Sequence, residues 1–227
     1  MQNLGLDYII KALPRLMGGM LITIKIAGIA LVLSIIFGFI LGILMTTKNK
    51  FLNIILRIFL EAFRLIHPLI WLFIFFFGLS YIFKIQTDNV EVSLLVFTLW
   101  GSFEIGDLVR SYIKSLPISQ FESSMAIGLS KRQMYTYVLI PQIIIRVTPS
   151  IVNLATRLIK TTTLIFLIGV PELLKVSQSV IQVVYYNNPN SIISFTMYLF
   201  LLILYFCLCY PLSLLARFLE KKVSVIS

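Results

Sequence analysis

The sequence SQFESSMAIGLSKRQMYTYVLIP, residues 119–141, is a polar, helix-forming segment within an otherwise apolar chain. Ser119 followed three residues later by Glu122 is the pattern of a capping box, in which each side chain accepts a hydrogen bond from the other residue's amide. A helix is therefore expected to start here. Phe121 and Met125 are four residues apart and share one face of that helix, so they would form an apolar knob that fits a partner's groove. An amphipathic helix that lies at the membrane surface without a partner is the alternative.

The second half of this segment has the pattern of a turn followed by a new helix. Gly128 is suited to the left-handed conformation that ends a helix. Ser130 with Gln133 three residues later repeats the capping-box pattern. The sequence therefore predicts two short helices that meet at a sharp bend.

The composition of the whole chain is that of an integral membrane protein. Of its 227 residues 59% are apolar and 12% are charged, and the mean hydropathy is +0.99, whereas a soluble domain is roughly half apolar and a quarter charged. The length suits a single all-α membrane domain over residues 1–227. The net charge of +10 is typical of basic residues that flank membrane spans. We therefore expect membrane lipid around the chain and no nucleic-acid partner.

Five apolar stretches are long enough to cross a bilayer core, which needs about 20 helical residues. The expected spans are about residues 19–47, 56–83, 91–116, 149–170 and 192–216, with residues 119–141 as a coupling loop between the third and the fourth. Each span is expected to be helical, and the protein is expected to be a polytopic membrane protein with five transmembrane helices.

Glycine and proline mark special points in the first two spans. Gly38 and Gly42 have the four-residue spacing that lets two helices approach closely; glycine that is merely tolerated in a membrane helix is the alternative. Pro68 interrupts the second span, and a proline there frees a backbone carbonyl and bends the helix axis.

Basic residues after the first, third and fifth spans indicate how the chain is oriented, because such residues stay on the cytoplasmic side. They are Lys48, Lys50 and Arg57, then Lys131 and Arg132, then Arg217, Lys221 and Lys222. The N-terminus and the stretch 171–190 are therefore expected outside, and the C-terminus in the cytoplasm.

Charged residues within the spans are candidates for a substrate pathway. Glu104 and Asp107 share one face of the third span, and Arg157 and Lys160 lie three apart near the middle of the fourth. Charges at membrane depth are costly and face a cavity or a partner. One interpretation is a buried salt-bridge network that holds helices together. The other is that the opposed charges bind a zwitterion, with carboxylates on its ammonium and cations on its carboxylate.

The second span adds two further candidates. Arg64 lies three residues after Glu61, a spacing at which the two can pair on one helix face. His67 is either a donor that faces the substrate or a buried imidazole bonded to a neighbour, and it has no metal-binding partners in the surrounding sequence.

Six positions in the segment 119–141 resemble the EAA loop of ABC importer permeases, whose pattern is Glu-Ala-Ala, three residues, Gly, and later Ile or Leu followed by Pro. These positions are Glu122, Ser123, Ser124, Gly128, Ile140 and Pro141, with serine in place of both alanines. In that family the loop is the coupling helix that docks into the ATP-binding subunit. The resemblance implies that the coupling residues are Phe121, Glu122, Ser123, Ser124, Met125 and Gly128.

Further segments resemble the polar amino-acid uptake branch of this family. Residues 63–70 are similar to its Phe-Arg-Gly-Thr-Pro-Leu segment, residues 101–120 to its Ala-Tyr-Leu-Ala-Glu-Ile-Phe-Arg-Gly stretch, and residues 160–164 to its Lys-Asp-Thr-Ser-Leu. The chain departs from the branch at Glu104, which replaces Tyr, and at Thr161, which replaces Asp. The added acid at Glu104 favours a basic or zwitterionic substrate.

The resemblance implies a type I ABC importer-like permease subunit in the bacterial inner membrane that imports a polar amino acid. Its partners would be two ABC ATP-binding subunits per complex, a second permease copy or homologue, and an extracytoplasmic amino-acid-binding protein. The sequence has no Gly-x-x-x-x-Gly-Lys-Ser/Thr phosphate loop, so ATP and Mg are expected in a partner subunit. We expect no enzyme activity, metal or cofactor in this chain itself. A secondary transporter or channel without an ATPase, and a membrane scaffold without a transport role, are the alternatives.

Overall fold

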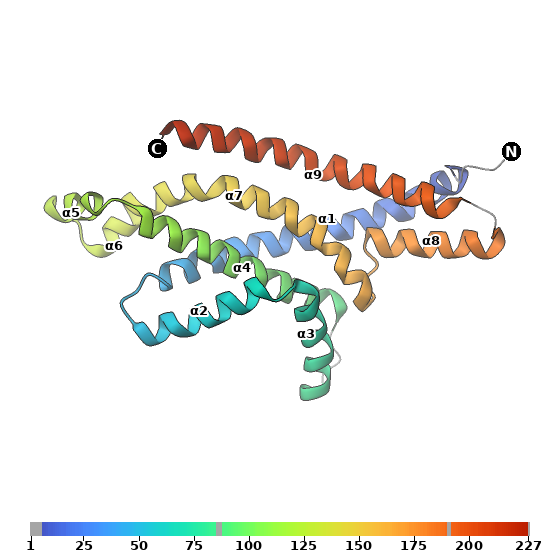
Figure 1. The fold of residues 1–227 in the computed structure, drawn as a ribbon, viewed down its shortest axis with the longest axis horizontal. Coiled ribbons are helices and arrows are strands. Elements are labelled where there is room, and N and C mark those ends of the chain that lie inside the picture. The colour runs from blue at the N-terminus through green and yellow to red at the C-terminus, as the bar shows by residue number, and fades with distance from the viewer. Residues whose placement is uncertain (1–5, 85–87, 190–191, 227) are drawn as a thin grey trace. The chain divides into compact units, whose positions relative to one another are not determined.

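The computed structural model describes residues 6–84, 88–189 and 192–226, and in these ranges the regular elements are all helices (Figure 1). In chain order they are α1 (Leu6–Leu44), α2 (Lys50–Leu65), α3 (Pro68–Phe83), α4 (Asn89–Ser115), α5 (Ile118–Ala126), α6 (Lys131–Gln133), the π-helix η1 (Met134–Leu139), α7 (Ile140–Thr161), the 3-10 helix η2 (Thr162–Ile168), α8 (Leu173–Asn187) and α9 (Ile193–Ile226). The expected all-α fold is confirmed.

The helices long and apolar enough to cross a membrane agree with the expected polytopic fold. Four continuous stretches qualify: Leu6–Leu44, Asn89–Ser115, Lys131–Ile168 and Ile193–Val223. A fifth is counted if the broken pair α2 and α3 is taken as one span. The described residues thus supply four or five crossings.

The expected second span, residues 56–83, is not a single helix. Helix α2 ends at Leu65, Ile66 has an extended backbone (φ −85°, ψ 127°), and α3 begins directly with Pro68. Proline disfavours a helical conformation in the residue before it, and its missing N–H costs nothing at the first position of a new helix. Pro68 therefore ends one helix and starts another, where the sequence had indicated a bend.

Helix α1 begins at Leu6, well before the expected start near Gly19. The early turns are polar on one side, but Ile9, Ala12 and Leu16 are buried, and their i, i+3, i+7 spacing places them on one helix face. That face packs in an apolar core with residues of α8 and α9. Burial of this face extends the helix beyond the continuous apolar run.

The chain divides into two compact units. The first consists of Met1–Ala30, Pro68–Phe97 and Ala155–Leu212, and the second of Leu31–His67, Thr98–Leu154 and Ser213–Ser227.

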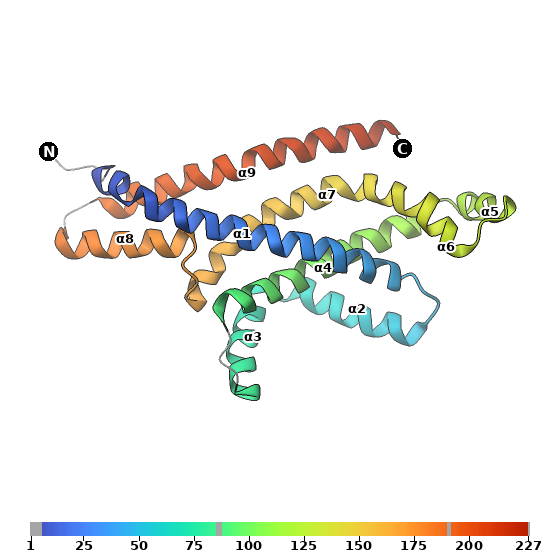
Figure 2. The ribbon, with the colours of Figure 1, turned by 180° about the vertical axis from the view of Figure 1, so that it is seen from behind.

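In the first unit, α8 packs beside the first half of α1 and the start of α9, as both ribbon views show (Figures 1 and 2). A Cβ added to Gly19 would lie 3.0 Å from the Leu173 Cα, so α1 and α8 are in close contact. Glu172, which is fully buried, caps α8 by accepting the Leu174 amide at 2.8 Å and the Lys175 amide at 2.7 Å. Burial raises the pKa of this carboxyl to about 7, and the two amide hydrogen bonds oppose the shift.

In the second unit, α1 and α4 pack through small residues. A Cβ added to Gly38 would lie 2.6 Å from the Ile105 Cβ, and one added to Gly42 would lie 2.5 Å from the Val109 Cβ. Ser34, one turn earlier on α1, donates a hydrogen bond to the Thr98 carbonyl at 3.2 Å. The close approach indicated by the glycine spacing is therefore present.

Candidate functional site

The helix of the predicted coupling segment begins two residues earlier than the sequence pattern indicated. Helix α5 starts at Ile118, with Pro117 as the N-cap and no side-chain hydrogen bond at the cap. The expected capping box between Ser119 and Glu122 is therefore wrong. Pro117 fixes its own φ at −59° and so sets the chain for helix before Ser119 is reached. Glu122 is left exposed on α5.

Gly128 ends α5 as predicted. Its φ is +80°, the left-handed conformation that costs glycine least. The Leu129 amide donates to the Ser124 carbonyl at 3.1 Å, and the Gly128 amide donates to the Met125 carbonyl at 3.0 Å. This pair of bonds is a Schellman motif, which satisfies carbonyls that the end of a helix leaves open.

The second capping box is confirmed. The Ser130 amide donates to Gln133 Oε1 at 2.9 Å, and the Gln133 amide donates to Ser130 Oγ at 3.3 Å. Helix α6 is only one turn long and continues through the π-helix η1 into α7. The sharp bend therefore joins α5 to the start of one long helical stretch, rather than to a second isolated helix.

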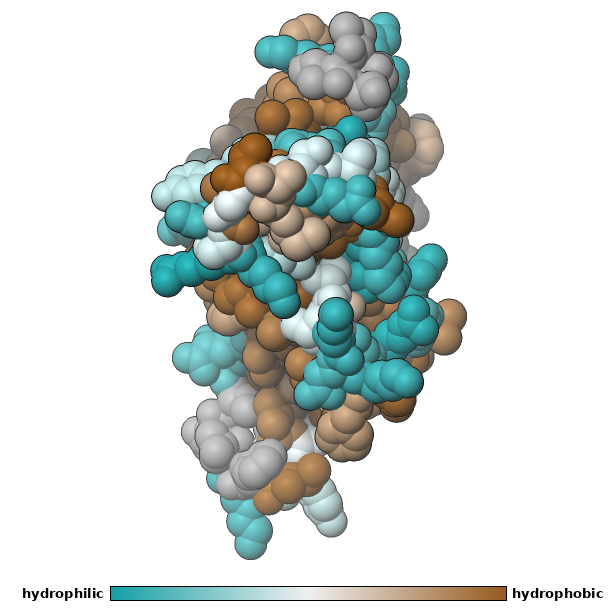
Figure 3. All heavy atoms as spheres, turned by 90° about the vertical axis from the view of Figure 1, so that its left-hand side faces the viewer, coloured by the Kyte–Doolittle hydropathy of each residue, from teal (hydrophilic) through white to brown (hydrophobic). Residues whose placement is uncertain are grey.

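The coupling segment exposes more apolar surface than the sequence indicated. The exposed fractions are 73% for Ile118, 58% for Met125 and 76% for Ile127, while Phe121 is only half-buried. Ile118, Phe121 and Met125 follow the i, i+3, i+7 spacing of one helix face, which is the signal that would have added Ile118. Figure 3, which faces this end of the second unit, shows apolar side chains lying beside hydrophilic ones.

The two serines of the segment have different surroundings. Ser123 is exposed, whereas Ser124 is buried and donates a hydrogen bond to the Gln120 carbonyl at 2.6 Å. A small residue at position 124 lets α5 lie close to the rest of the second unit, where α5 contacts η1.

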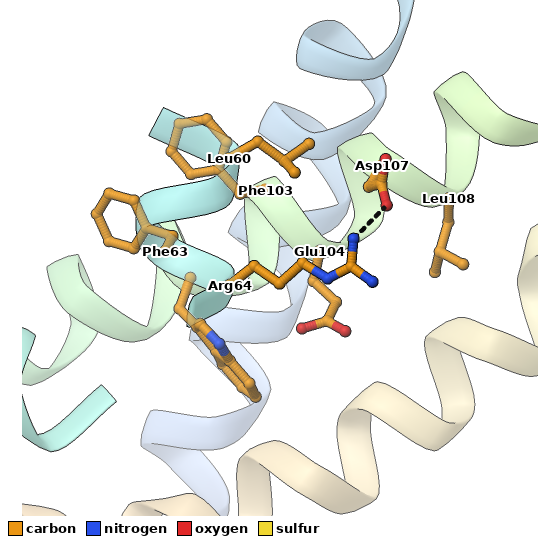
Figure 4. A pocket seen from close by; sticks show the side chains of 8 residues that line it. Leu60, Phe63, Arg64, Phe103, Glu104, Asp107 and Leu108 are labelled. Atoms are coloured by element: carbon orange, nitrogen blue, oxygen red, sulfur yellow. Dashed lines mark ion pairs between the residues drawn. The ribbon is translucent and has the colours of Figure 1, made fainter. Parts of the chain in front are cut away.

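A pocket of about 210 Å³ lies between α2 and α4 in the second unit (Figure 4). It is lined by Leu60, Phe63, Arg64, Trp100, Phe103, Glu104, Asp107 and Leu108. Phe63 and Phe103 stack with their ring centroids 5.0 Å apart. The pocket thus combines an aromatic wall with three charged side chains.

Asp107 connects two arginines at this pocket. Its Oδ2 lies 3.9 Å from Arg64 Nη1, and its Oδ1 accepts hydrogen bonds from Arg110 Nε at 3.1 Å and from Arg110 Nη2. Figure 4 shows the Arg64 guanidinium extending toward Asp107, with Glu104 beside it. The ion pair of Arg64 is therefore with Asp107 on α4, not with Glu61 as the sequence spacing suggested. The Arg64 side chain is 65% exposed, so its pair with Asp107 adds little stability.

The remaining candidates lie outside this pocket. His67 is exposed at the break between α2 and α3 and is not among the residues lining the pocket. Arg157 and Lys160 are exposed near the end of α7 and belong to the first unit. Their role in a substrate pathway stays a prediction. Among the described residues, no three His, Cys, Asp or Glu side chains gather as a metal site.

Most of the chain is similar in sequence to known proteins. Residues 34–225 match the family model described as "Binding-protein-dependent transport system inner membrane component". The chain is 30% identical over 215 residues to the probable glutamine ABC transporter permease protein GlnP of Bacillus subtilis, covering 95% of this chain and 96% of that protein. It is 28% identical to the putative glutamine transport system permease protein GlnP of Rickettsia typhi, covering 97% and 99%.

Two solved structures have a similar fold. One, described as an amino acid ABC transporter with histidines, superimposes with a TM-score of 0.82 at 20% identity, covering 94% of this chain and 96% of that one. The other, an inward-facing form of the MetNI methionine ABC transporter, gives a TM-score of 0.68 at 17% identity, covering 96% and 98%. At these identities the likeness concerns the fold.

Proposed function

The chain belongs to the family of inner membrane components of binding-protein-dependent transport systems, and on that premise we propose that it is the permease subunit of an ATP-driven importer for a polar amino acid. The observation that carries the proposal is the coupling segment. A short helix with exposed apolar side chains, ended by a left-handed glycine, lies within the matched residues. Such a surface fits the groove of a partner.

The contacts of α5 support its role as a coupling helix. The Schellman hydrogen bonds fix the direction in which the chain leaves α5, and α5 contacts η1, which continues into α7. A displacement of α5 by a docked ATP-binding subunit would therefore move a membrane-spanning helix. Transport needs the docked subunit to favour one access state over the other, because only differential binding shifts such an equilibrium.

The pocket between α2 and α4 is the proposed contact site for the substrate. Glu104 would accept the ammonium group of an amino acid, and the exposed Arg64 would bind its carboxylate. Asp107 would hold Arg64 in place. The names of two relatives support the substrate class, since both GlnP proteins are described as glutamine permeases. We propose His67, Arg157 and Lys160 as further residues along the pathway.

The complex would contain two ATP-binding subunits, which bind ATP and Mg, a second permease copy or homologue, and an extracytoplasmic amino-acid-binding protein. The family description supports the binding protein as a partner. The second unit carries α5 together with Lys131, Arg132, Lys221 and Lys222. We therefore propose that this unit's coupling segment is cytoplasmic and that the N-terminus is outside.

Co-purification of the tagged chain from its own host tests the proposal. An ABC-type ATP-binding subunit should come with the wild type and be lost when Met125→Asp puts a charge on the exposed face of α5. Ser119→Asp is the matched control, because it adds the same charge to the same helix without removing apolar surface, and it should keep the partner. Charging Phe121 is a second variant, with a stronger effect expected because that side chain is half-buried.

Two results would contradict this function. Recovery of the chain without any ATP-binding subunit, with uptake that survives ATP depletion but not collapse of an ion gradient, would indicate a secondary transporter. Retention of the ATP-binding subunit by Met125→Asp and by Phe121→Asp would show that α5 is not the docking surface.

A further inference from the structure

A second pocket in the same unit is lined by cations. Its volume is about 240 Å³, and the residues that line it are Met45, Lys50, Asn53, Ile54, Arg57, Arg110 and Lys114. They come from the chain just after α1, from the first turns of α2 and from the end of α4. No acidic residue is among these lining residues, so four positive side chains face one small space.

Most of these cations are not neutralised by the protein. Arg110 bonds to Asp107, but within residues 6–84, 88–189 and 192–226 no ion pair engages Lys50, Arg57 or Lys114. Like charges that converge repel each other and attract an anion. The planar guanidinium of Arg57 and the ammonium groups of the lysines are the donors that bind phosphate in proteins.

Asn53 adds a hydrogen-bond acceptor to a pocket whose charged side chains are all hydrogen-bond donors. Its Nδ2 donates to the Thr47 carbonyl at 2.6 Å, which fixes the orientation of the amide. Its Oδ1 is buried and accepts no hydrogen bond from the described residues. A buried acceptor without a partner is unfavourable, so a ligand that brings a hydroxyl to this atom would gain affinity.

An apolar stripe leads away from the pocket along α2. Phe51, Ile54 and Ile58 are exposed to 74%, 58% and 64%, and their i, i+3, i+7 spacing places them on one side of the helix. Ile54 also lines the pocket. In a membrane protein such a stripe lies against acyl chains, so a molecule with its anionic group in the pocket can lay its tail along α2.

We propose that this pocket binds the headgroup of an anionic phospholipid that carries a hydroxyl, with phosphatidylglycerol as the simplest example. The phosphate would lie among Lys50, Arg57, Arg110 and Lys114, a headgroup hydroxyl would donate to Asn53 Oδ1, and one acyl chain would follow Ile54 and Ile58. The lining residues lie where helices end near the membrane surface, which is the depth of lipid phosphates. The stripe favours a lipid over free phosphate as the occupant.

Native mass spectrometry of the purified full-length chain tests the proposal. The chain is delipidated in detergent and titrated with 1-palmitoyl-2-oleoyl phosphatidylglycerol or with phosphatidylcholine of the same chains. One phosphatidylglycerol should bind at least tenfold more tightly than phosphatidylcholine. The double variant Lys50→Gln with Arg57→Gln should remove this preference; both side chains are exposed, so the fold should be kept.

The matched control is Arg217→Gln with Lys222→Gln, which removes the same charge from exposed positions of α9 and should keep the preference. Equal loss of phosphatidylglycerol in both double variants would overturn the proposal, because it would indicate general charge attraction. Equal affinity of the wild type for the two lipids would overturn it without any variant.

Two further titrations identify the source of the phosphate and the role of Asn53. Millimolar inorganic phosphate should not displace the bound lipid; displacement would assign the pocket to a soluble anion and overturn the lipid site. Phosphatidylethanol has the same charge as phosphatidylglycerol but no headgroup hydroxyl, and it should bind several-fold more weakly. Equal binding of these two lipids would contradict the assigned role of Asn53.

Discussion

Gly128 shows how one backbone conformation can govern the coupling segment. Its φ of +80° is left-handed, and a Cβ added there would meet no atom within 4 Å. Any cost of substitution therefore comes from the backbone, roughly 1–2 kcal/mol for a residue other than glycine. We expect Gly128→Val to uncouple ATP hydrolysis from uptake while leaving membrane insertion intact, as measured in reconstituted complexes.

Two further variants test whether the left-handed backbone of Gly128 is the cause of this effect. Gly18→Val places the same side chain at a helical glycine that also has open space around it, and it should leave coupling unchanged. Gly128→Asn should fall between valine and the wild type, since asparagine tolerates the left-handed region. Wild-type uptake by Gly128→Val would contradict the hypothesis that this left-handed conformation sets the direction of α5.

The two acids of the pocket between α2 and α4 should differ in their effects. Asp107 bonds to Arg64 and Arg110, so Asp107→Asn should reduce uptake of all substrates by loosening both arginines. Glu104→Gln removes the acceptor proposed for the α-ammonium group, so it should raise the KM several-fold for every amino acid, and more for a cationic one because the pocket wall also loses a negative charge. Uptake assays with cationic and neutral amino acids test this, and an unchanged KM for both would show that Glu104 does not contact the substrate.

Among the elements, the contact between α1 and α4 is the one most sensitive to side-chain size. Gly38 and Gly42 face Ile105 and Val109 so closely that an added Cβ would overlap them. Gly38→Leu should destabilise the second unit by about 1–3 kcal/mol, the usual cost of overpacking, and lower the melting temperature of the purified chain.

A paired variant distinguishes this contact from a general effect of a larger residue. Gly38→Ala and Ile105→Ala should each lower the melting temperature, but the double variant should lose less than the two losses added together, because Ile105→Ala removes the Cγ2 that would lie 2.8 Å from the added Cβ. Gly18→Leu should have little effect. If the double variant is no more stable than the sum of the two single changes implies, Gly38 and Ile105 do not share a contact.

The sequence predicts those features that depend on near neighbours in the chain. The left-handed turn at Gly128 and the capping box at Ser130 follow from residues within one helical turn, and both are present. The capping box at Ser119 fails because a different local signal, Pro117, starts the helix first. Both Pro117 and the Ser119–Glu122 pattern indicate a helix start, and the sequence alone does not show which of the two sets the first residue of the helix.

Features that depend on distant segments are harder to predict. The Arg64–Asp107 ion pair joins residues on α2 and α4. The sequence spacing instead indicates Glu61, three residues before Arg64 on the same helix, as the partner of Arg64. Glu172 caps α8 through amides only two and three residues away, but the hydrogen bond that it accepts from the Tyr205 hydroxyl at 3.4 Å comes from α9. The cationic pocket was not predicted because Lys50 and Lys114 come together only through the packing of α2 and α4.

For the whole molecule, the distribution of basic residues predicts which segments face which side of the membrane. The coupling segment precedes Lys131 and Arg132, and positive residues stay cytoplasmic, so position 123 should be cytoplasmic. Helix α8 follows the next span and should be external. Both Ser123 and Tyr186 are exposed, the latter to 88%, so each can report on its own side.

Thiol labelling in intact cells measures this topology. The free cysteines Cys207 and Cys209 are first replaced by serine, and Ser123→Cys or Tyr186→Cys is then introduced alone. In cells that express the chain without its ATP-binding subunit, which would otherwise cover α5, a membrane-impermeant maleimide should label Tyr186→Cys when the cells are intact and Ser123→Cys only after they are permeabilised. Labelling of Ser123→Cys in intact cells would place the coupling segment outside, where no ATP-binding subunit could reach it, and would contradict the importer function itself.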